Sequence, residues 1–419
     1  MKPTSPYLLP SVAYSTSELR NLNRLKARRK RWLDVHLWLG LTLGFFLALF
    51  GLTGSVLVFY EEIDNLLNTD LRQIPAQTKG ESAYHPLSEI LAAAKTSLPS
   101  EAKLGFVDYP ADNETTYKFG FNFPTTTPEK IDEWFVYVDP YQARVIGKQL
   151  IKKADELLPH PLIPFVFRLH FALLAGETGG IIVGIMGVIL VFSLLTGLIV
   201  WWPLTGHWRR ALTIKHHASA KRLNHDLHQT FGFYSFPVLL AILLSGVYMN
   251  LPDPFMVLVK QLSPGTQGFN DTPHSSPAQG RSPIGLGQAL TIARNRYPEG
   301  RVDWLSNAES ETGAYIIGIS DVPGLSRFWS ERQISIDQYS GAILKAQDPS
   351  TRQTAGQTFV EWQWPLHSGR AFGWPGRITV FVAGLACPVL FITGVIRWLQ
   401  KRRAKKVKRE GSKKHLGFP

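Results

Sequence analysis

Residues 34–40 read Asp-Val-His-Leu-Trp-Leu-Gly, and residues 226–232 read Asp-Leu-His-Gln-Thr-Phe-Gly. Each segment places a histidine two residues after an aspartate and opens a long apolar run. The first run, 35–60, exceeds the roughly 20 residues that an α-helix needs to cross a bilayer. Two acidic residues follow it instead of a small-residue cleavage site, so we expect an uncleaved membrane anchor rather than a signal peptide.

Three more apolar runs of similar length occur in the 419-residue chain, at 181–202, 231–251 and 378–398. Tryptophans stand at several run ends, as they do at membrane–water interfaces. Hydrophobic residues make up 45% of the chain and are concentrated in these blocks, which excludes an ordinary soluble protein. The sequence therefore predicts an α-helical membrane protein with a bundle of four transmembrane helices.

The basic residues predict the orientation of these helices. About half of the 45 lysines and arginines lie in three short segments, before the first run, between the second and third runs, and after the fourth. Because such segments stay on the cytoplasmic side, both termini should be cytoplasmic and the long connections 62–180 and 252–377 should lie outside. The net charge of +13 then reflects topology and contact with membrane lipid, and nucleic acid is not an expected partner.

Four histidines recur at matched distances before a glycine, and a threonine or serine precedes each of these glycines. The distance is 18 residues in one set and 27 in the other: His36 to Gly54 and His228 to Gly246, then His170 to Gly197 and His367 to Gly394. Such self-similarity indicates a tandem duplication of residues 32–203 and 224–398, with a pseudo-twofold axis along the membrane normal.

The two long connections repeat as well. Each has a helix-like run, at 86–94 or 284–293, followed by strand-like pieces in which apolar and polar residues alternate. The pieces, and the aspartates that open the turns after them, are Tyr117–Phe121, Trp134–Val138, Tyr315–Ile319, Arg332–Ile336, Asp139 and Asp337. Each connection should form one helix on a small antiparallel sheet, which gives two small α+β modules.

The four repeated histidines are the strongest candidates for a functional site. An ionisable residue at a membrane span suggests function, and neutral imidazole is a standard axial ligand of haem. Under the pseudo-twofold axis, His36 should face His228 and His170 should face His367. This arrangement suggests two haems of the b type, one nearer each leaflet. No Cys-x-x-Cys-His segment is present for covalent attachment, and the one cysteine lies inside an apolar span.

Other interpretations of these segments remain open. His225 could share a helix face with the candidate three residues later and is a weaker candidate ligand. The repeated histidines could only make interfacial hydrogen bonds, and His170 and His367 could lie in short helices before their spans. Asp34 and Asp226 could orient an imidazole, although we favour helix N-caps for both. The glycines of the first two spans could leave room for a porphyrin or allow close helix packing.

Taken together, these features resemble the PepSY-associated transmembrane family, whose members are often described as iron-regulated or iron-uptake membrane proteins. The resemblance spans residues 30–400 and rests on the two Asp-x-His openings, the two outer histidines, the Trp201-Trp202-Pro203 ending and the paired connections. It implies a four-helix bundle with two periplasmic PepSY-like modules in a bacterial inner membrane. For some members it also implies a di-haem reductase that passes electrons to ferric siderophores.

The resemblance and the histidines lead to one hypothesis for the function. A haem-dependent membrane oxidoreductase would move electrons from the cytoplasmic side to a periplasmic acceptor and reduce ferric siderophore or ferric iron for iron uptake. Because no Gly-x-Gly-x-x-Gly fingerprint is present, the donor would be a quinol, a flavin or a partner reductase. Candidates for contact with the acceptor or with haem propionates lie near the outer histidines: Arg168, Arg370, Trp362, Trp364 and Trp374.

Two other classes of function are compatible with the sequence. The chain could be a non-enzymatic, membrane-anchored PepSY module that binds or inhibits a periplasmic partner, although an anchor has no need of repeated histidines. Transport of a substrate between the repeats is less favoured, because the spans show no evident carboxylate pair.

These considerations divide the chain into nine predicted segments. Cytoplasmic segments are expected at 1–31, 204–224 and 399–419, and the PepSY-like modules at 62–160 and 252–358. The membrane segments, of which the second and fourth include a periplasmic lead-in, are expected at 32–61, 161–203, 225–251 and 359–398.

Overall fold

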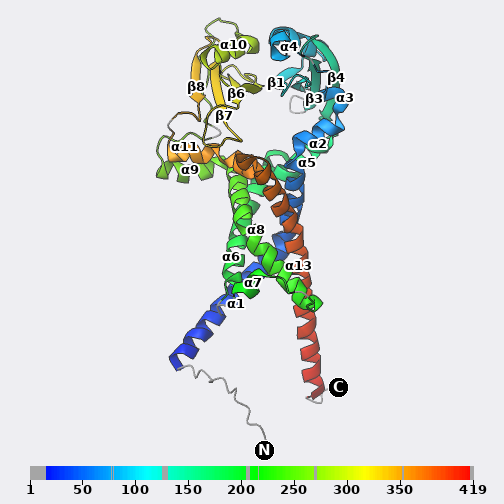
Figure 1. The fold of residues 1–419 in the computed structure, drawn as a ribbon, viewed down its shortest axis with the longest axis vertical. Coiled ribbons are helices and arrows are strands. Elements are labelled where there is room, and N and C mark those ends of the chain that lie inside the picture. Colours follow the sequence, from blue (N-terminus) through cyan, green and yellow to red (C-terminus); the bar gives the residue numbers. More distant parts are fainter. Residues whose placement is uncertain are drawn as a thin grey trace, which may run out of the picture. The chain divides into compact units, whose positions relative to one another are not determined.

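The computed structural model describes residues 16–76, 78, 80–124, 131–203, 208–215, 217–268, 271–351 and 353–415. The outer ends of the two predicted cytoplasmic tails, and residues 204–207 and 216 of the predicted cytoplasmic connection, lie outside the described residues. The described chain forms long helices and a sheet domain (Figure 1).

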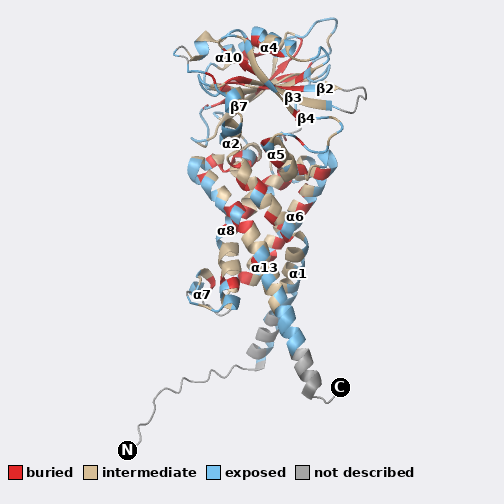
Figure 2. Cartoon of the chain, turned by 90° about the vertical axis from the view of Figure 1, so that its right-hand side faces the viewer, coloured by how far each residue is buried: buried red, intermediate tan, exposed pale blue. Residues whose placement is uncertain are grey.

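Four helices of the described residues are long and apolar enough to cross a membrane, as the sequence predicts. They are α1 (Thr16–Leu57), α6 (Gly176–Trp201), α8 (Ala220–Asn250) and α13 (Gly373–His415). Much of their apolar surface is not covered by the chain itself (Figure 2), and Ile181, Ile185 and Val188 of α6 are each about half exposed. Helices that expose apolar residues on this scale need a lipid environment. The chain is therefore a multi-pass membrane protein.

Contacts divide the chain into two compact units, and the division crosses all four long helices. The first unit comprises residues 1–48, 189–236 and 388–419, and it contains one end of each long helix together with α7 (Trp208–Leu212). The second unit comprises residues 49–188 and 237–387 and contains the other helix ends and the sheet domain.

All strands that the structure describes belong to one antiparallel sheet, in the order β4-β3-β2-β1-β5-β6-β7-β8. The predicted strand-like pieces lie in β2, β3, β6 and β7, so those predictions are confirmed, whereas the other four strands were not predicted. The strand bounds are β1 Lys103–Asp108, β2 Tyr117–Pro124, β3 Ile131–Asp139, β4 Arg144–Lys152, β5 Arg301–Ser306, β6 Ala314–Ser320, β7 Glu331–Asp337 and β8 Ile343–Gln347.

The two halves of this sheet come from the two long connections. β1 and β5 pair antiparallel at its centre, with Val107 opposite Leu305. The sequence predicts two separate small sheets, and the structure joins them through these backbone hydrogen bonds. The junction removes two strand edges that would otherwise expose unpaired N–H and C=O groups.

Two helices cover one face of the sheet, α4 (Leu87–Thr96) and α10 (Leu286–Arg296), both at their predicted positions. Side chains of a strand alternate between faces, so every second strand residue points at these helices. Phe119 and Leu305 of the strands and Ile90 and Ala293 of the helices are fully buried in the common core. Burial of this apolar surface, at roughly 25 cal/mol per Å², is the main source of stability of the sheet domain.

Buried aspartates form the predicted turns after β3 and β7. A carboxylate oxygen of Asp337 accepts hydrogen bonds from the backbone N–H groups of Tyr339 and Ser340, and Asp139 does the same in the first connection. Burial alone would raise the pKa of Asp337, but the N–H groups that surround it outweigh burial and lower the pKa to about 2. The carboxylate of Asp337 therefore stabilises its turn in the ionised form.

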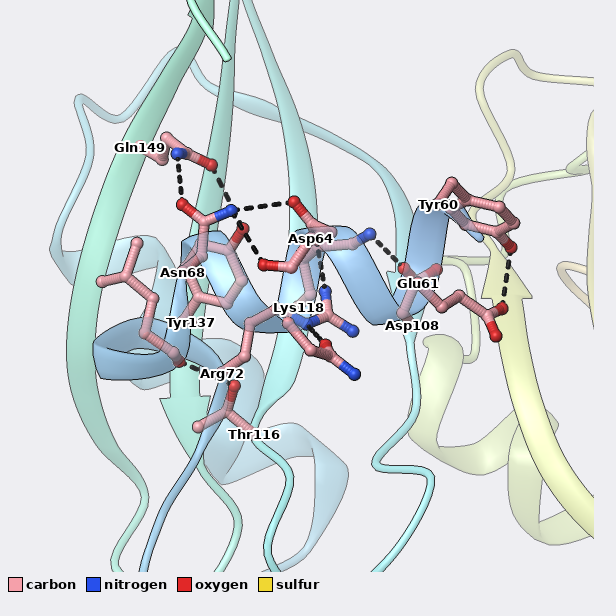
Figure 3. A network of polar contacts seen from close by, with 12 residues as sticks. Tyr60, Glu61, Asp64, Asn68, Arg72, Asp108, Thr116, Lys118, Tyr137 and Gln149 are labelled. Carbon is pink, nitrogen blue, oxygen red and sulfur yellow. Dashed lines mark hydrogen bonds and ion pairs between the residues drawn. The ribbon is translucent and has the colours of Figure 1, made fainter. Parts of the chain in front are cut away.

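Short helices connect the long helices to the sheet domain. α2 (Tyr60–Leu67) and α3 (Thr69–Arg72) follow α1 and take part in the polar network of Figure 3, where Asp64 pairs with Arg72 at 3.2 Å and Asn68 accepts a hydrogen bond from Gln149 of β4 at 2.9 Å. The other short helices are η1 (Gly80–Ala83), α5 (Leu162–Ala172), α9 (Pro252–Leu262), α11 (Ala355–Glu361), α12 (Gln363–Ser368) and η2 (Arg370–Phe372).

Candidate functional site

The four repeated histidines form two close pairs. His36 of α1 and His228 of α8 belong to the first unit, and their ring centres lie 6.3 Å apart with the ring planes at 68°. His170 of α5 and His367 of α12 belong to the second unit, with ring centres 6.1 Å apart and planes at 70°. The structure brings together the partners that the sequence pairs, and the second pair lies in short helices that precede the long ones.

His36 is held by a carbonyl, a hydroxyl and a glycine of α6. Its Nδ1 lies 3.1 Å from the carbonyl oxygen of Ser193 and 3.2 Å from Oγ1 of Thr196, and that hydroxyl donates to the same carbonyl at 2.7 Å. A Cβ on Gly197 would lie 2.9 Å from Cε1 of the ring, so a larger residue would push the imidazole away. Because a carbonyl oxygen can only accept, Nδ1 carries the proton and Nε2 keeps its lone pair.

His228 is held in the same way by α13. Its Nδ1 lies 3.1 Å from the carbonyl oxygen of Leu390 and 2.9 Å from Oγ1 of Thr393. A Cβ on Gly394 would lie 3.5 Å from Cε1 of the ring. We call this combination a histidine cradle: a backbone carbonyl, a hydroxyl residue three positions later, and the glycine that follows it.

His170 has a cradle on α1. Its Nδ1 lies 2.9 Å from Oγ1 of Thr53, the ring makes a backbone hydrogen bond with Phe50, and a Cβ on Gly54 would lie 3.1 Å from Cε1. Burial, together with the neighbouring His367, lowers the pKa of His170 to about 3. The ring is therefore neutral at pH 7.

His367 has a cradle on α8. Its Nδ1 lies 3.0 Å from the carbonyl oxygen of Ile242 and 3.0 Å from Oγ of Ser245, and a Cβ on Gly246 would lie 3.3 Å from Cε1. Burial lowers the pKa of His367 to about 4, so this ring is also neutral at pH 7.

The four cradles explain why a hydroxyl residue and a glycine recur at fixed distances from the histidines. The repeated pattern is visible in the sequence, but its role was not predicted, because the role depends on which helix faces which histidine. Each cradle fixes the tautomer of its ring and leaves Nε2 without a hydrogen bond to any described residue. An imidazole held through Nδ1 in this way is prepared to act as a metal ligand through Nε2.

Other glycines of the first two spans serve close helix packing. A Cβ on Gly51 would lie 2.5 Å from the carbonyl oxygen of Gly384, and one on Gly184 would lie 2.5 Å from Leu251. Gly40, in contrast, has no atom within 4 Å of its Cβ position. Gly51 and Gly184 therefore allow close helix packing, whereas Gly54 and Gly197 make room for imidazoles.

The two aspartates do not cap their helices, so that prediction is wrong. α1 and α8 begin well before the apolar runs, and Asp34 and Asp226 lie inside them. Asp34 is exposed, whereas Asp226 is buried and accepts a hydrogen bond from Nε of Arg222 at 2.8 Å. Nδ1 of His225 lies 3.5 Å from Asp226, and His225 has no cradle among the described residues.

The arginines predicted near the outer histidines are already paired with carboxylates. Arg168 forms an ion pair with Glu133 of β3, and Arg370 forms one with Glu61 of α2 at 2.8 Å. The guanidinium of Arg370 also lies 5.5 Å from the ring centre of Trp329. These contacts connect the segments around the His170–His367 pair to the sheet domain and to α2.

The predicted tryptophans differ in exposure. Trp364 and Trp374 are exposed and Trp362 is half-buried. Trp374 stacks on Phe59 with ring centres 6.0 Å apart, which fixes its orientation. The two exposed rings, Trp364 and Trp374, stand three and seven residues from His367 in the sequence and provide exposed aromatic surface.

Each histidine pair offers two ligands. Across the part of the chain that the structure describes, no group of three or more histidine, cysteine, aspartate or glutamate side chains is placed to hold a metal ion. A pair of imidazoles suits a cofactor that brings the remaining ligands of its metal with it, as a porphyrin does.

Comparison with known proteins identifies the family. No curated protein matches the chain. The sequence model of the PepSY-associated TM region matches residues 33–401, a range that includes all four paired histidines, their cradles and the sheet domain. The chain therefore belongs to the family of the PepSY-associated TM region.

Proposed function

We propose that this protein is a di-haem b membrane oxidoreductase that moves electrons across a bacterial inner membrane to a periplasmic acceptor. One observation carries the proposal: two pairs of imidazoles have their ring centres 6.3 and 6.1 Å apart, and every ring is held through Nδ1. The acceptor class that we favour is a ferric siderophore or another form of ferric iron.

The spacing within each pair suits one iron between two imidazoles. Metal–imidazole bonds of about 2 Å place two rings on opposite sides of one metal with their centres roughly 6 Å apart. The separations in both pairs agree with this expectation. Haem fits better than a bare ion, because each pair supplies only two side-chain ligands within the described residues.

The side chains and cradles would prepare each site for its cofactor. Donation of the Nδ1 proton to a backbone carbonyl increases the basicity of Nε2 and fixes the plane of the ring. Burial keeps His170 and His367 neutral, so both present a lone pair at pH 7. A haem iron bound between such rings supplies one-electron transfer.

We also propose that the chain has cytoplasmic termini, a periplasmic sheet domain and an internal duplication. The basic segments favour cytoplasmic termini and a periplasmic sheet domain. For the limits of the cytoplasmic, membrane and periplasmic segments we propose the nine ranges predicted from the sequence. The four matching cradles, and one helix with four strands in each long connection, support a tandem duplication of residues 32–203 and 224–398.

Reduction of the acceptor would release iron from its chelator. Ferrous iron is softer than ferric iron and binds oxygen ligands less tightly, so the gain of one electron weakens a siderophore complex. The exposed rings of Trp364 and Trp374 are candidates for contact with such a complex. The electrons would come from a quinol, a flavin or a partner reductase.

The first test is a reduced-minus-oxidised absorption spectrum of the purified full chain, with haem quantified as pyridine haemochrome. We expect two haems b per chain, and we expect a ferric siderophore to reoxidise the reduced protein. The same siderophore loaded with gallium(III), which cannot accept the electron, is the matched control. A chain that stays colourless when made with ample haem would overturn the proposal and favour a membrane-anchored module that binds or inhibits a partner.

A further inference from the structure

An arginine lies one helical turn beyond the cradle of His36. The carbonyl of Val200 on α6 accepts a hydrogen bond from Nη2 of Arg29 at 2.7 Å. Val200 follows Gly197 of that cradle by three residues, and residues three apart lie on the same face of a helix. Arg29 is thus held beside the His36 side of the first pair.

Arg397 occupies the matching place on α13. It follows Gly394 of the His228 cradle by three residues and therefore shares its helix face. Its partly buried guanidinium lies close enough to Arg29, His36 and His228 to interact with all three electrostatically. Arg29 and Arg397 therefore lie one helical turn beyond the cradles of His36 and His228, close enough to each other to interact electrostatically.

The described residues supply no anion for these two charges. Neither guanidinium forms an ion pair with a described carboxylate. Neither nearby aspartate pairs with these arginines among the described residues. Asp34 is exposed and lies close enough to Lys401 to interact with it electrostatically, and Asp226 accepts a hydrogen bond from Nε of Arg222 at 2.8 Å. Like charges placed together without a counter-ion repel each other, and they do so more strongly where water is partly excluded.

One buried polar atom near His228 also has no partner. Oγ1 of Thr230 is buried without a hydrogen bond to any described residue. Buried polar atoms in folded proteins nearly always have a partner, so this atom is consistent with a ligand or water at this end of the first unit.

The other pair differs in this respect. Arg168 and Arg370, which stand close in sequence to His170 and His367, are neutralised by Glu133 and Glu61. The need for an external anion is therefore specific to the His36–His228 pair.

We propose that Arg29 and Arg397 form an anion site that binds the two propionate carboxylates of the porphyrin held by His36 and His228. The inference rests on the proposed function and assigns residues that the sequence had indicated only as signals of orientation. A guanidinium offers paired N–H donors that match the geometry of a carboxylate, and such charge-assisted hydrogen bonds are strong. The anion also removes the repulsion between the two arginines.

The test uses the full chain with Arg29→Gln, Arg397→Gln and both together. Arg31→Gln and Arg403→Gln are the matched controls, because these arginines are exposed on the same two helices. The measurements are haem content, the two midpoint potentials and the exchange of haem for its dimethyl ester, in which both carboxylates are blocked. In the double variant we expect the affinity for the haem held by His36 and His228 to fall at least about tenfold, and we expect the midpoint potential of that haem to decrease. We also expect the preference for haem over the ester to disappear at that site, while the other haem and both control variants match the wild type.

The outcomes separate this inference from the proposed function. Two wild-type potentials and an unchanged ester preference in the double variant would overturn the anion site but leave the di-haem proposal intact. Unchanged potentials together with loss of co-purifying anionic phospholipid would also overturn it, because the arginines would then bind lipid phosphate. A wild-type chain without haem would overturn both proposals.

Discussion

The His36–His228 and His170–His367 pairs have the same internal design and different surroundings. All four rings are held by cradles, and the ring separations differ by only 0.2 Å between the pairs, at 6.3 and 6.1 Å. The first pair lies on long membrane-length helices beside two arginines without a described counter-ion. The second lies on short helices whose arginines are paired with Glu133 and Glu61. Local helix register thus sets the geometry of the imidazoles, whereas the neighbouring charges set the electrostatic environment, so two histidine pairs of one design differ in their surroundings.

Substitution of the paired histidines should have the largest effect and should distinguish the two pairs most clearly. We expect His36→Ala to abolish one haem and His170→Ala to abolish the other, because an iron with one remaining protein ligand is held far more weakly. The double variant should be colourless. Pyridine haemochrome quantification and redox titration of the remaining haem measure these effects. His225→Ala is the matched control, and its loss of a complete haem would contradict the assignment of His228.

Substitution of each cradle glycine by alanine should cause a loss of haem that increases as the space between the glycine and the imidazole decreases. The Cβ positions lie 2.9 Å from the ring at Gly197, 3.1 Å at Gly54, 3.3 Å at Gly246 and 3.5 Å at Gly394. Forcing an extra methyl group into a packed site typically costs about 1–3 kcal/mol, so haem loss should be greatest at Gly197 and least at Gly394. Haem occupancy and thermal unfolding measure the series. Gly40→Ala is the control, since nothing lies within 4 Å, and equal damage there would contradict the steric explanation.

Loss of the cradle hydroxyls should have a smaller effect. Thr196→Val and Thr53→Val each remove one partner of Nδ1 and leave the backbone carbonyl in place. Loss of an outer partner of a metal-bound histidine lowers affinity by about tenfold or somewhat more, and we expect the lower end of that range because the carbonyl remains. Haem retention during dilution measures the effect at each site. Thr42→Val should behave as wild type, because among the described residues the Thr42 hydroxyl donates only to carbonyl groups of α1 itself.

Neutralising the carboxylates of the second pair should change its charge environment with little effect on folding. Glu61→Gln and Glu133→Gln each release an arginine near His170 and His367, so the midpoint potential of that haem should rise while the other stays unchanged. Both ion pairs are partly exposed, so the expected loss of stability is below about 1 kcal/mol each. Redox titration and thermal unfolding measure the two effects, with Glu89→Gln on α4 as control. A shift confined to the other haem would contradict the comparison between the pairs.

The sequence predicted the parts of the fold that depend on local pattern. Hydropathy located the four membrane-length helices, and alternation located β2, β3, β6 and β7. Hydropathy marks where apolar residues begin and not where a helix begins, which is why the capping role of Asp34 and Asp226 was wrong. The pairing of β1 with β5 could not be predicted, because it joins segments far apart in the chain and neither strand has a distinctive pattern.

The pairing of the histidines could be predicted from the sequence repeat, but the cradles that hold the rings could not. Spacing alone indicated that His36 belongs with His228, whereas the cradle of His36 on α6 depends on how two helices are placed side by side. The same limit applies to charge. Arg168 and Arg370 were chosen for their closeness in sequence to the outer histidines, and the sequence gives no sign that Glu133 and Glu61 occupy them.

The junction of β1 and β5 has a consequence for how the protein is made. β1 leaves the ribosome early, and its partner exists only after the chain has passed through two further membrane-length helices, α6 and α8. At 5–20 residues per second this interval lasts on the order of ten seconds or more. During that time the unpaired edge of β1 is open to chaperones or to another nascent copy. Translation that stops after α6 would leave that edge permanently open, so release of a half-length product should favour aggregation, whereas completion of the second half closes the edge from within the same molecule.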